Sequence, residues 1–237
     1  MGTVEKLLLF YGHGESLFRE FIADVEPDLV RGAVSPLCRI MHAHGSDKGL
    51  GWHNYTYLYH KLFTRFLNKP ENVFELGLGT DNPDIAASMG VNGVPGASLR
   101  GWREYFTGAT ICGADIDRRV LFQEPGIQTL YVDQTDLASV MSLWAHVPAQ
   151  FDLMIDDGRH ELEANKTFLY GSKHKLKDSG LYIIEDIIMS SENIFGFDQV
   201  FNSAVMSGFL YRLPYARNLN DNSIAVLCGP NFVLPAG

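Results

Sequence analysis

Residues 73–81 read VFELGLGTD, a short apolar run followed by two glycines two positions apart. Gly77 and Gly79 permit a tight turn and a close approach of the backbone to a ligand. A dinucleotide-binding fingerprint would carry its third glycine where this chain has Asn82, which speaks against NAD. We interpret the segment as a strand that ends in a ligand-binding turn.

Outward from this segment, short apolar runs alternate with helical patterns. The apolar runs cover residues 110–116, 128–132, 151–155 and 180–184, and the helical patterns cover 98–106, 137–145, 161–176 and 198–206. Strands that alternate with helices predict a mostly parallel sheet covered on both faces. Two further runs, 209–213 and 223–228, are joined by the turn-rich residues 218–222, which predicts a C-terminal antiparallel hairpin at the sheet's edge.

The N-terminal third has a different pattern. Residues 16–25 and 54–67 carry apolar side chains at helical spacing, and the polar segment Gly45-Ser46-Asp47-Lys48-Gly49 reads as a loop between them. We therefore predict an α/β fold with two parts, a helical N-terminal extension or lid over residues 1–69 and a Rossmann-like domain over 70–237.

Composition narrows the class of protein. The chain has 237 residues, 46% of them apolar, and a formal net charge of −9. An acidic balance disfavours binding to nucleic acid or to an anionic membrane surface. The three cysteines are far apart and show no zinc-site spacing. We find neither a signal peptide nor a run of about 18 apolar residues, so we expect a cytoplasmic protein.

Acidic and amide side chains end the second and third predicted strands of the parallel series. In an open parallel sheet, ligands bind beyond the carboxyl ends of the strands. An acid after residues 110–116 can accept hydrogen bonds from both ribose hydroxyls of an adenosine-type ligand; we choose Asp117, with Asp115 as the alternative. Asp133 or Gln134 can accept from an adenine amino group. Three acids on three consecutive strand ends, counting Glu75, are more specific than any one alone.

The next two strand ends bring four carboxylates and a histidine together. Their sequences are Asp156-Asp157-Gly158-Arg159-His160 and Glu185-Asp186. Such a concentration of carboxylates is costly unless a cation neutralises it, and oxygen ligands suit Mg²⁺ or Mn²⁺. His160 could remove a proton from a hydroxyl. The alternative is that Asp156 and Glu185 cap the following helices.

These motifs resemble a known family. The order of five parallel strands followed by a hairpin is similar to class I methyltransferases, which bind S-adenosylmethionine (SAM), and Glu75 would tolerate the cationic methionine part of that cofactor. Residues 156–160 resemble the DDGSH segment of the macrocin and mycinamicin sugar O-methyltransferases. Residues 96–106 and the segment Gly45–Gly49, with His53, Tyr55, Thr56 and Tyr59, are also similar to that family, over about residues 45–190.

The resemblance implies roles for particular residues. It implies a Mg²⁺ site formed by Asp157, Glu185 and Asp186, with His160 as general base beside Asp157. Ser46, Asp47 and Lys48 would help close over SAM. The remaining residues assigned to the cofactor site on residue or family grounds are Glu75, Gly77, Gly79, Ser98, Asp115, Asp117, Asp133, Gln134 and Asp156.

Two departures from the family are visible. Arg159 replaces the family's serine, which makes the pocket beside the base bulkier and more cationic. The macrolide enzymes also carry a large additional N-terminal domain for which this chain has no room, so their substrate and oligomeric state need not transfer.

The expected activity is methyl transfer to a hydroxyl of a sugar or polyhydroxylated small molecule, in natural-product or polysaccharide biosynthesis. Two alternatives remain. One is an oxygenase or hydroxylase-like enzyme on the same scaffold, which would need His53 or His174 as a second histidine ligand. The other is a non-catalytic protein that binds SAM or a nucleotide. A homo-oligomer is expected only from family habit. We expect Tyr55, Tyr59 and Trp102 to be packing residues.

Overall fold

The computed structural model describes residues 20–22, 34–49, 51–67, 69–188, 190–204, 206–213 and 215–231. The strands of this part are β1 (Glu20–Ile22), β2 (Asn72–Leu76), β3 (Thr110–Asp115), β4 (Gln123–Glu124), β5 (Ile127–Tyr131), β6 (Phe151–Asp156), β7 (Leu176–Ile184), β8 (Ser207–Arg212) and β9 (Ser223–Cys228). The helices are α3 (Pro36–His44), α4 (Tyr55–Phe66), α5 (Ala97–Tyr105), α6 (Leu137–Ala145), α7 (Leu162–Ser172) and α8 (Ser191–Ala204), with short 3₁₀ turns η1 (Arg118–Val120) and η2 (Lys173–Lys175).

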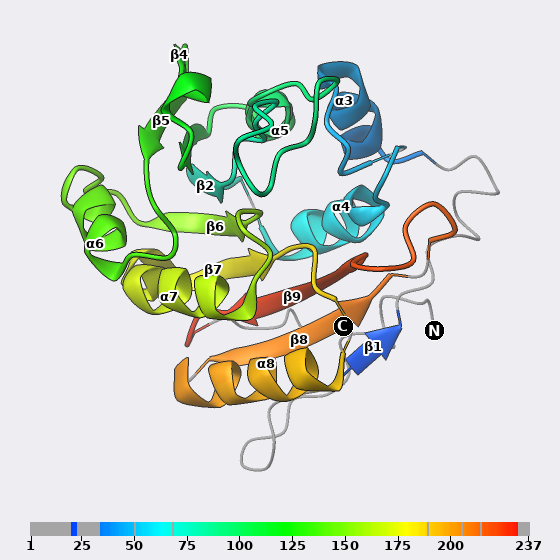
Figure 1. Ribbon diagram of the computed structural model, residues 1–237, viewed down its shortest axis with the longest axis vertical. Coiled ribbons are helices and arrows are strands. Elements are labelled where there is room, and N and C mark those ends of the chain that lie inside the picture. The colour runs from blue at the N-terminus through cyan, green and yellow to red at the C-terminus, as the bar shows by residue number, and fades with distance from the viewer. Residues whose placement is uncertain are drawn as a thin grey trace.

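Within the described residues, the strands form one sheet in the order β1-β8-β9-β7-β6-β2-β3-β5-β4 (Figure 1). The central strands β7, β6, β2, β3 and β5 are parallel, so their carboxyl ends share one edge. The order reverses at β2, which has β3 on one side and β6 on the other. A crevice for a ligand is expected at such a switch point.

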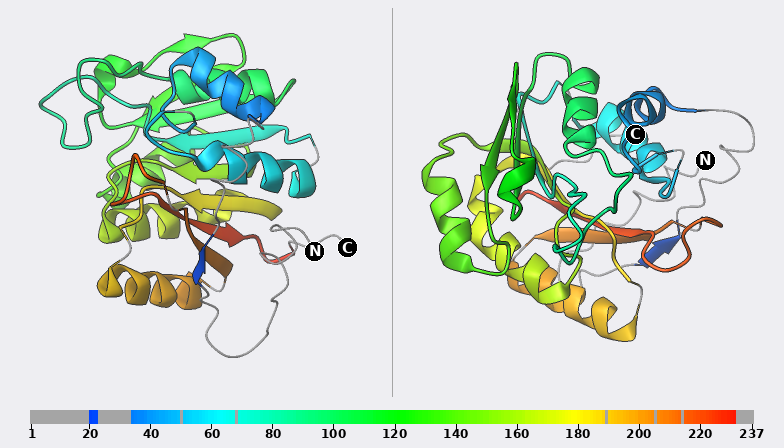
Figure 2. Two further views of the ribbon diagram at one scale, coloured as in Figure 1. Left: turned by 90° about the vertical axis from the view of Figure 1, so that its right-hand side faces the viewer. Right: turned by 45° about the horizontal axis from the view of Figure 1, so that its top comes forward.

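Helices cover both faces of the sheet, as the α/β pattern predicted (Figure 2). Side chains alternate between two cores, because successive residues of a strand point to opposite faces. Val73 joins the core under α3, α4 and α5, whereas Phe74 and Leu76 join the core under α6, α7 and α8. Strands buried on both sides account for the continuous apolar runs in the sequence.

Three predictions about the elements need correction. The helix predicted over 16–25 is wrong at Glu20–Ile22, which form β1 and pair with β8. The outer edge of β8 offers unpaired backbone groups, and β1 hydrogen-bonds to them. The rest of the range 16–25 lies outside the described residues. The C-terminal antiparallel hairpin forms as predicted, with β9 beside β7, but it does not end the sheet, because β1 pairs with the outer side of β8. β7 begins at Leu176, four residues before the predicted start at 180, in a polar segment that apolar periodicity does not reveal.

The described part of the N-terminal region shares the core of the sheet. Leu37 and Met41 of α3 and Tyr59 and Phe63 of α4 pack in the same buried cluster as Trp102 of α5. The Ser35 hydroxyl caps α3 by accepting from Cys38 N at 3.0 Å, and Gly45 ends it in the left-handed conformation at φ 85°. The described residues that follow α3 bring Lys48 to the carboxyl edge of the sheet, where its side chain contacts Asp157 and Glu185.

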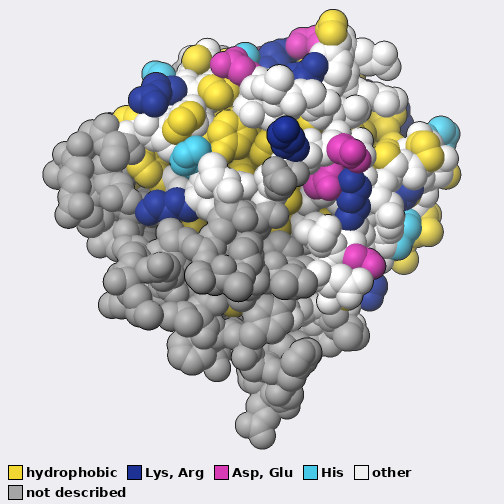
Figure 3. All heavy atoms as spheres, turned by 180° about the vertical axis from the view of Figure 1, so that it is seen from behind, with side chains coloured by type: hydrophobic (Ala, Val, Ile, Leu, Met, Phe, Trp, Pro, Cys, Tyr) yellow, Lys and Arg dark blue, Asp and Glu magenta, His cyan; other side chains and the backbone are white. Residues whose placement is uncertain are grey.

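On the face shown in Figure 3, described basic and acidic side chains are interspersed rather than segregated. Among the described helices, none combines the length and apolar character needed to cross a lipid bilayer. Cys38, Cys112 and Cys228 are buried free thiols, and burial raises the pKa of Cys112 and Cys228 to about 12.

Candidate functional site

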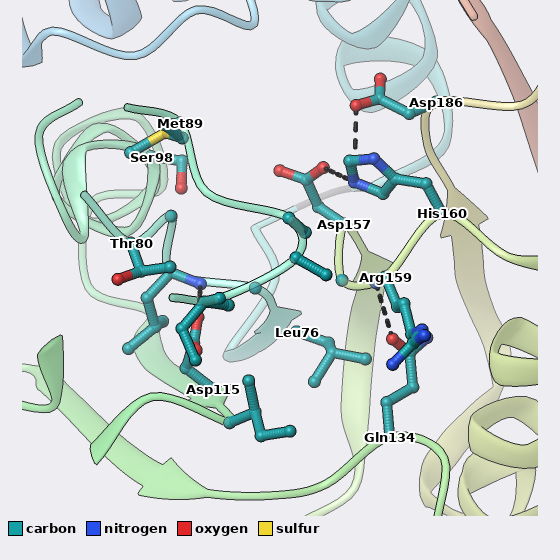
Figure 4. A pocket seen from close by; sticks show the side chains of 18 of the residues that line it. Leu76, Thr80, Met89, Ser98, Asp115, Gln134, Asp157, Arg159, His160 and Asp186 are labelled. Atoms are coloured by element: carbon teal, nitrogen blue, oxygen red, sulfur yellow. Dashed lines mark hydrogen bonds and ion pairs between the residues drawn. The ribbon is translucent and has the colours of Figure 1, made fainter. Parts of the chain in front are cut away.

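A pocket of about 370 Å³ opens at the carboxyl edge of the parallel strands (Figure 4). Asp115 and Gln134 lie toward one end of it, and Asp157, His160 and Asp186 lie toward the other. Its size lies within the range of small-molecule sites. Of the predicted cofactor residues, those that line it are Ser46, Lys48, Gly77, Gly79, Ser98, Asp115, Asp133 and Gln134. Glu75, Asp117 and Asp156 are absent from its lining.

The glycine turn after β2 brings two backbone segments together. Gly77 has φ 87°, and a Cβ atom there would lie 1.9 Å from the carbonyl oxygen of Asp157. Gly79 has φ 70°, and its Cβ would lie 2.3 Å from the Met89 side chain. The left-handed backbone favours glycine at both positions, and the backbone contact at Gly77 leaves no room for a Cβ atom. Both glycines line the pocket.

The acid after β3 that faces the pocket is Asp115, the alternative, rather than the preferred Asp117. Asp115 lines the pocket and accepts from Leu78 N at 2.7 Å. Asp117 lies just past the strand's last residue, and it caps η1 instead. Its carboxylate accepts from Thr80 Oγ1 at 2.7 Å and from Arg119 Nε at 2.7 Å. The Arg119 hydrogen bonds hold the pKa of Asp117 far below its usual value despite burial.

Asp156 supports the pocket from behind instead of contacting a ligand. It is completely buried, and its carboxylate accepts from Gln134 Nε2 at 2.7 Å and from Asn165 Nδ2 at 3.1 Å. Gln134 Oε1 accepts in turn from Arg159 N at 2.8 Å. Burial raises the pKa of Asp156 to about 6, against the effect of these hydrogen bonds. Asp156 therefore fixes Gln134 and the loop after β6 in place.

The acidic end of the pocket brings together Asp157, His160 and Asp186. His160 Nε2 lies 3.3 Å from Asp157 Oδ1 and 3.5 Å from Asp186 Oδ2, as the dashed lines in Figure 4 show. His160 and Asp186 both have positive φ, 59° and 54°, a conformation that non-glycine residues adopt at a cost and that clusters at functional sites. The structure thus confirms that the two strand ends converge.

The proximity of the carboxylates changes the basicity of His160. Burial disfavours the imidazolium form, but the hydrogen bond to Asp157 and the charges of Asp186, Asp157 and Asp156 outweigh it. They raise the pKa of His160 to about 9. Without a bound cation, the imidazole therefore carries a proton at neutral pH.

Two tyrosines of α4 hold the acids, although we predicted them to be packing residues. Tyr55 donates to Asp186 Oδ1 at 2.5 Å, and Tyr59 donates to Glu185 Oε1 at 2.6 Å. The two residues are four apart and lie on one face of the helix. Their spacing in the sequence predicts a helix, but nothing local indicates that their hydroxyls meet acids from the end of β7. His53 Nε2 also lies 3.6 Å from Asp186 Oδ1.

Lys48 lies among the acids rather than near the middle of the pocket. Its Nζ is 2.5 Å from Asp157 Oδ2 and 3.1 Å from Glu75 Oε1, and it also donates to Glu185 Oε2. Trp102 Nε1 donates to Glu75 Oε2 at 2.5 Å. Glu75 was expected to face the cationic end of SAM, but Lys48 and Trp102 enclose it completely.

The side chains at the acidic end of the pocket could hold a small divalent cation, with part of the predicted ligand set. Asp157, His160 and Asp186 each offer one ligand atom, and these atoms lie within 4.8 Å of one another. Carboxylate oxygens beside an open pocket suit Mg²⁺ or Mn²⁺. Glu185, the third predicted ligand, instead faces Lys48 and Tyr59 and is 2% exposed. The structure therefore places two of the three predicted ligands at the pocket.

Comparison with known proteins agrees with this geometry. No protein-family model matches the chain. A tetracenomycin-C rhamnosyl 2'-O-methyltransferase of Streptomyces olivaceus is 34% identical over 173 residues, which cover 72% of this chain and 42% of that protein. Demethylmacrocin O-methyltransferase of Streptomyces fradiae is 32% identical over 136 residues, 57% of this chain and 32% of that protein. The chain is a relative of these sugar O-methyltransferases.

A solved structure extends the likeness to the fold. The MycE methyltransferase of mycinamycin biosynthesis, solved with Mg, SAH and mycinamycin VI, superposes with a TM-score of 0.61 at 22% identity, over 82% of this chain and 55% of that chain. At this identity the superposition shows the fold, a Rossmann-like methyltransferase fold. This relative of the sugar O-methyltransferases spans less than half the length of the curated proteins it matches.

Proposed function

We propose that the protein is a SAM-dependent, Mg²⁺-dependent O-methyltransferase that acts on a hydroxyl of a sugar or polyhydroxylated small molecule. One observation carries the proposal: a single pocket joins Asp115 and Gln134 at one end to Asp157, His160 and Asp186 at the other. The first pair suits an adenosine, and the second group suits a cation beside a proton acceptor. The relatedness to enzymes that methylate sugar hydroxyls supports this assignment.

The cofactor would lie along the glycine turn, with its ribose at Asp115 and its adenine near Asp133 and Gln134. SAM would supply an electrophilic methyl group there. Ser46 and Ser98 line the same pocket and would close it from the side of α3 and α5. The chain's own contribution is to hold donor and acceptor in line and to exclude water.

Asp157 and Asp186 would hold Mg²⁺, with Glu185 as the third predicted ligand. The ion would supply a Lewis acid that lowers the pKa of the acceptor hydroxyl. His160 Nε2 would take the hydroxyl proton. This role requires a neutral imidazole, and His160 becomes neutral more readily once the charges of Asp157 and Asp186 are shared with a cation.

No observation favours the two alternative functions. An oxygenase would need a second histidine ligand, but the ligand atoms that group within 4.8 Å of one another in the described residues include one histidine, His160. His53 Nε2 lies 3.6 Å from Asp186 Oδ1 and is not a member of that group. His174 lies in η2, before β7 begins, and so at the amino edge of the sheet. A protein that merely binds SAM would not need His160 between two carboxylates.

We propose that residues 1–69 act as an extension or lid and that residues 70–237 bind SAM. The contacts of Lys48, Tyr55 and Tyr59 with the acids support this division. We propose a cytoplasmic enzyme of natural-product or polysaccharide biosynthesis with a small-molecule or saccharide acceptor and no nucleic-acid or membrane partner. A homo-oligomer remains a proposal from family habit.

The test measures both ligands and turnover. Calorimetric titration should show SAM binding, and incubation with SAM, Mg²⁺ and a panel of glycosides should yield S-adenosylhomocysteine and a methylated sugar. EDTA should stop turnover, and excess Mg²⁺ should restore it. SAM binding with turnover that EDTA leaves untouched would refute the metal role, and failure to bind SAM would refute the whole assignment.

A further inference from the structure

The ammonium group of Lys48 is the only lysine or arginine charge, among the described residues, that forms an ion pair with the acids at this end of the pocket. Its Nζ lies 2.5 Å from Asp157 Oδ2 and 3.1 Å from Glu75 Oε1, and it donates to Glu185 as well. Lys48 is 2% exposed although it lines the pocket. Lysine is almost never buried to this degree unless it is paired, so its three partners explain its position.

The backbone around Lys48 is anchored on both sides. Lys48 O accepts from Thr56 N at 3.2 Å, and Asp47 O accepts from His53 N at 3.0 Å. Ser46 Oγ accepts from Lys48 N at 3.3 Å. These bonds tie the loop to the first turn of α4, which also carries Tyr55. These backbone bonds fix the Cα of Lys48, so an exchange of partners would involve its side chain alone.

The charges at this end do not balance. Glu75, Asp157, Glu185 and Asp186 carry four potential negative charges, against which the Lys48 ammonium and the His160 imidazolium supply two positive charges. Buried carboxylates without sufficient counter-charge are costly, and Glu75 and Glu185 are both almost completely buried. A divalent cation would supply the two positive charges that are missing.

Lys48 and the proposed cation need the same carboxylates. Two of the three predicted metal ligands, Asp157 and Glu185, are already hydrogen-bonded to the ammonium group. The third partner of Lys48, Glu75, is a different case: it does not line the pocket, and Trp102 fixes its other oxygen. Glu75 can therefore keep the ammonium paired if Asp157 and Glu185 turn to a cation.

We propose that Lys48 is an internal counter-ion that competes with the divalent cation. In the metal-free protein it holds Asp157 and Glu185 in position, and on cation binding it releases them and stays paired with Glu75. This inference rests on the proposed function, because it assumes a cation at Asp157. Lys48 is thus a positioning residue that sets the affinity of the site for metal. Ser46 and Asp47, which precede Lys48 in the chain, line the pocket as well. A change of partners at Lys48 would therefore take place next to residues proposed to contact the cofactor.

The main competing explanation is that Lys48 only locks the fold together. The two explanations predict opposite effects on metal affinity. If Lys48 is a lock that shapes the ligands, its removal weakens cation binding. If it is a competitor, its removal tightens cation binding, because a positive charge in a buried site repels a divalent ion strongly.

The experiment titrates Mn²⁺ into wild-type protein, Lys48→Met and the matched control Lys166→Met by calorimetry. Lys166 pairs with Glu163 on the surface of α7, away from the pocket. We expect Lys48→Met to bind Mn²⁺ at least about tenfold more tightly than wild type, and Lys166→Met to bind as wild type does. Unchanged or weaker binding by folded Lys48→Met overturns the inference and leaves the proposed function intact.

A second measurement needs no variant, in case Lys48→Met does not fold. A crystal structure of wild-type protein soaked in Mn²⁺ should show Nζ within hydrogen-bond distance of Glu75 and released from Asp157 and Glu185. An ammonium group that still contacts both ligands beside bound Mn²⁺ overturns the inference alone. If neither protein binds Mn²⁺, the metal role in the proposed function fails, and the inference fails with it.

Discussion

Tyr55 donates a hydrogen bond to Asp186 at 2.5 Å across 131 positions of the sequence. Burial, together with the charge of Asp186, raises the pKa of Tyr55 well above its usual value, so the hydroxyl remains a donor at any physiological pH. Through this bond, helix α4 holds the strand end that carries Asp186, and the N-terminal part of the chain becomes part of the acidic site.

Replacement of Tyr55 by phenylalanine should destabilise the protein. Loss of the donor leaves a buried carboxylate short of a partner, which costs roughly 1.5–3 kcal/mol for a hydrogen bond to a charged group. Urea unfolding followed by circular dichroism measures the effect. Tyr105→Phe is the control, because Tyr105 OH meets the neutral ring of His60 at 2.7 Å in a half-buried position, and it should lose less. Equal losses in the two variants would contradict the importance of the bond to Asp186.

Replacement of His160 by alanine should remove catalysis but not cofactor binding. Loss of a general base lowers kcat by roughly a hundredfold to ten-thousandfold, while the residues at the Asp115 end keep their contacts. Turnover of S-adenosylmethionine and calorimetric binding of S-adenosylhomocysteine measure the two effects. His146→Ala, on an exposed histidine bonded to Ser142 O, should have wild-type kcat. A His160→Ala enzyme with nearly full turnover would remove the base from the mechanism.

Replacement of Gly77 by alanine should destabilise the protein far more than the same change at Gly90. Both glycines have positive φ, 87° and 76°, so both variants bear the same kind of backbone strain. A Cβ at Gly77 would lie 1.9 Å from Asp157 O, whereas one at Gly90 meets nothing within 4 Å. We expect a difference in unfolding free energy of roughly 2–4 kcal/mol, measurable by urea denaturation. Similar stabilities would show that the turn after β2 relaxes easily.

The titration of His160 should respond to divalent cations. Its pKa is raised to about 9 from about 6.5 in the unfolded chain, so its stabilising contribution is complete below the lower value and is lost as pH rises through the higher one. Mg²⁺ bound to Asp157 and Asp186 should lower this pKa. NMR of the imidazole with and without Mg²⁺, assigned with His160→Gln, measures the shift. An identical titration in both states would argue against a cation at these carboxylates.

The sequence predicts the centre of this fold well because the central strands are buried on both faces. Apolar runs such as 151–155 and 223–228 have no competing interpretation once helical patterns separate them. The edge strands of the sheet are harder to predict. The apolar spacing over 16–25 predicts a helix, whereas Glu20–Ile22 form β1, because pairing with the distant strand β8 leaves no local signal in the sequence. The start of β7 is also hard to predict, because the polar residues Lys177, Asp178 and Ser179 follow Leu176 and interrupt the apolar run.

Some residues of the candidate site can be predicted from the sequence, and others cannot. Asp157, His160 and Asp186 are found from the sequence because parallel strands must end at one edge. The distinction between Asp115 and Asp117 depends on where β3 stops, which periodicity does not fix. Lys48 and Tyr55 meet the acids only through packing of α4 on the sheet, so their partners were beyond prediction even though both residues had been singled out.

The position of β9 between β7 and β8 has a consequence for how the newly synthesised chain folds. Asn222, just before this strand, lies 3.0 Å from His53 in a side-chain contact, and Asp221 O accepts from Tyr55. A newly synthesised chain must therefore contain both the residues near 53–55 and those near 221–222 before the acidic end of the pocket can form. Until β9 is synthesised, β7 has an unpaired edge, and distant contacts of this kind form slowly. We expect overexpression at low temperature to favour soluble protein, because it gives that late strand time to insert before exposed edges associate.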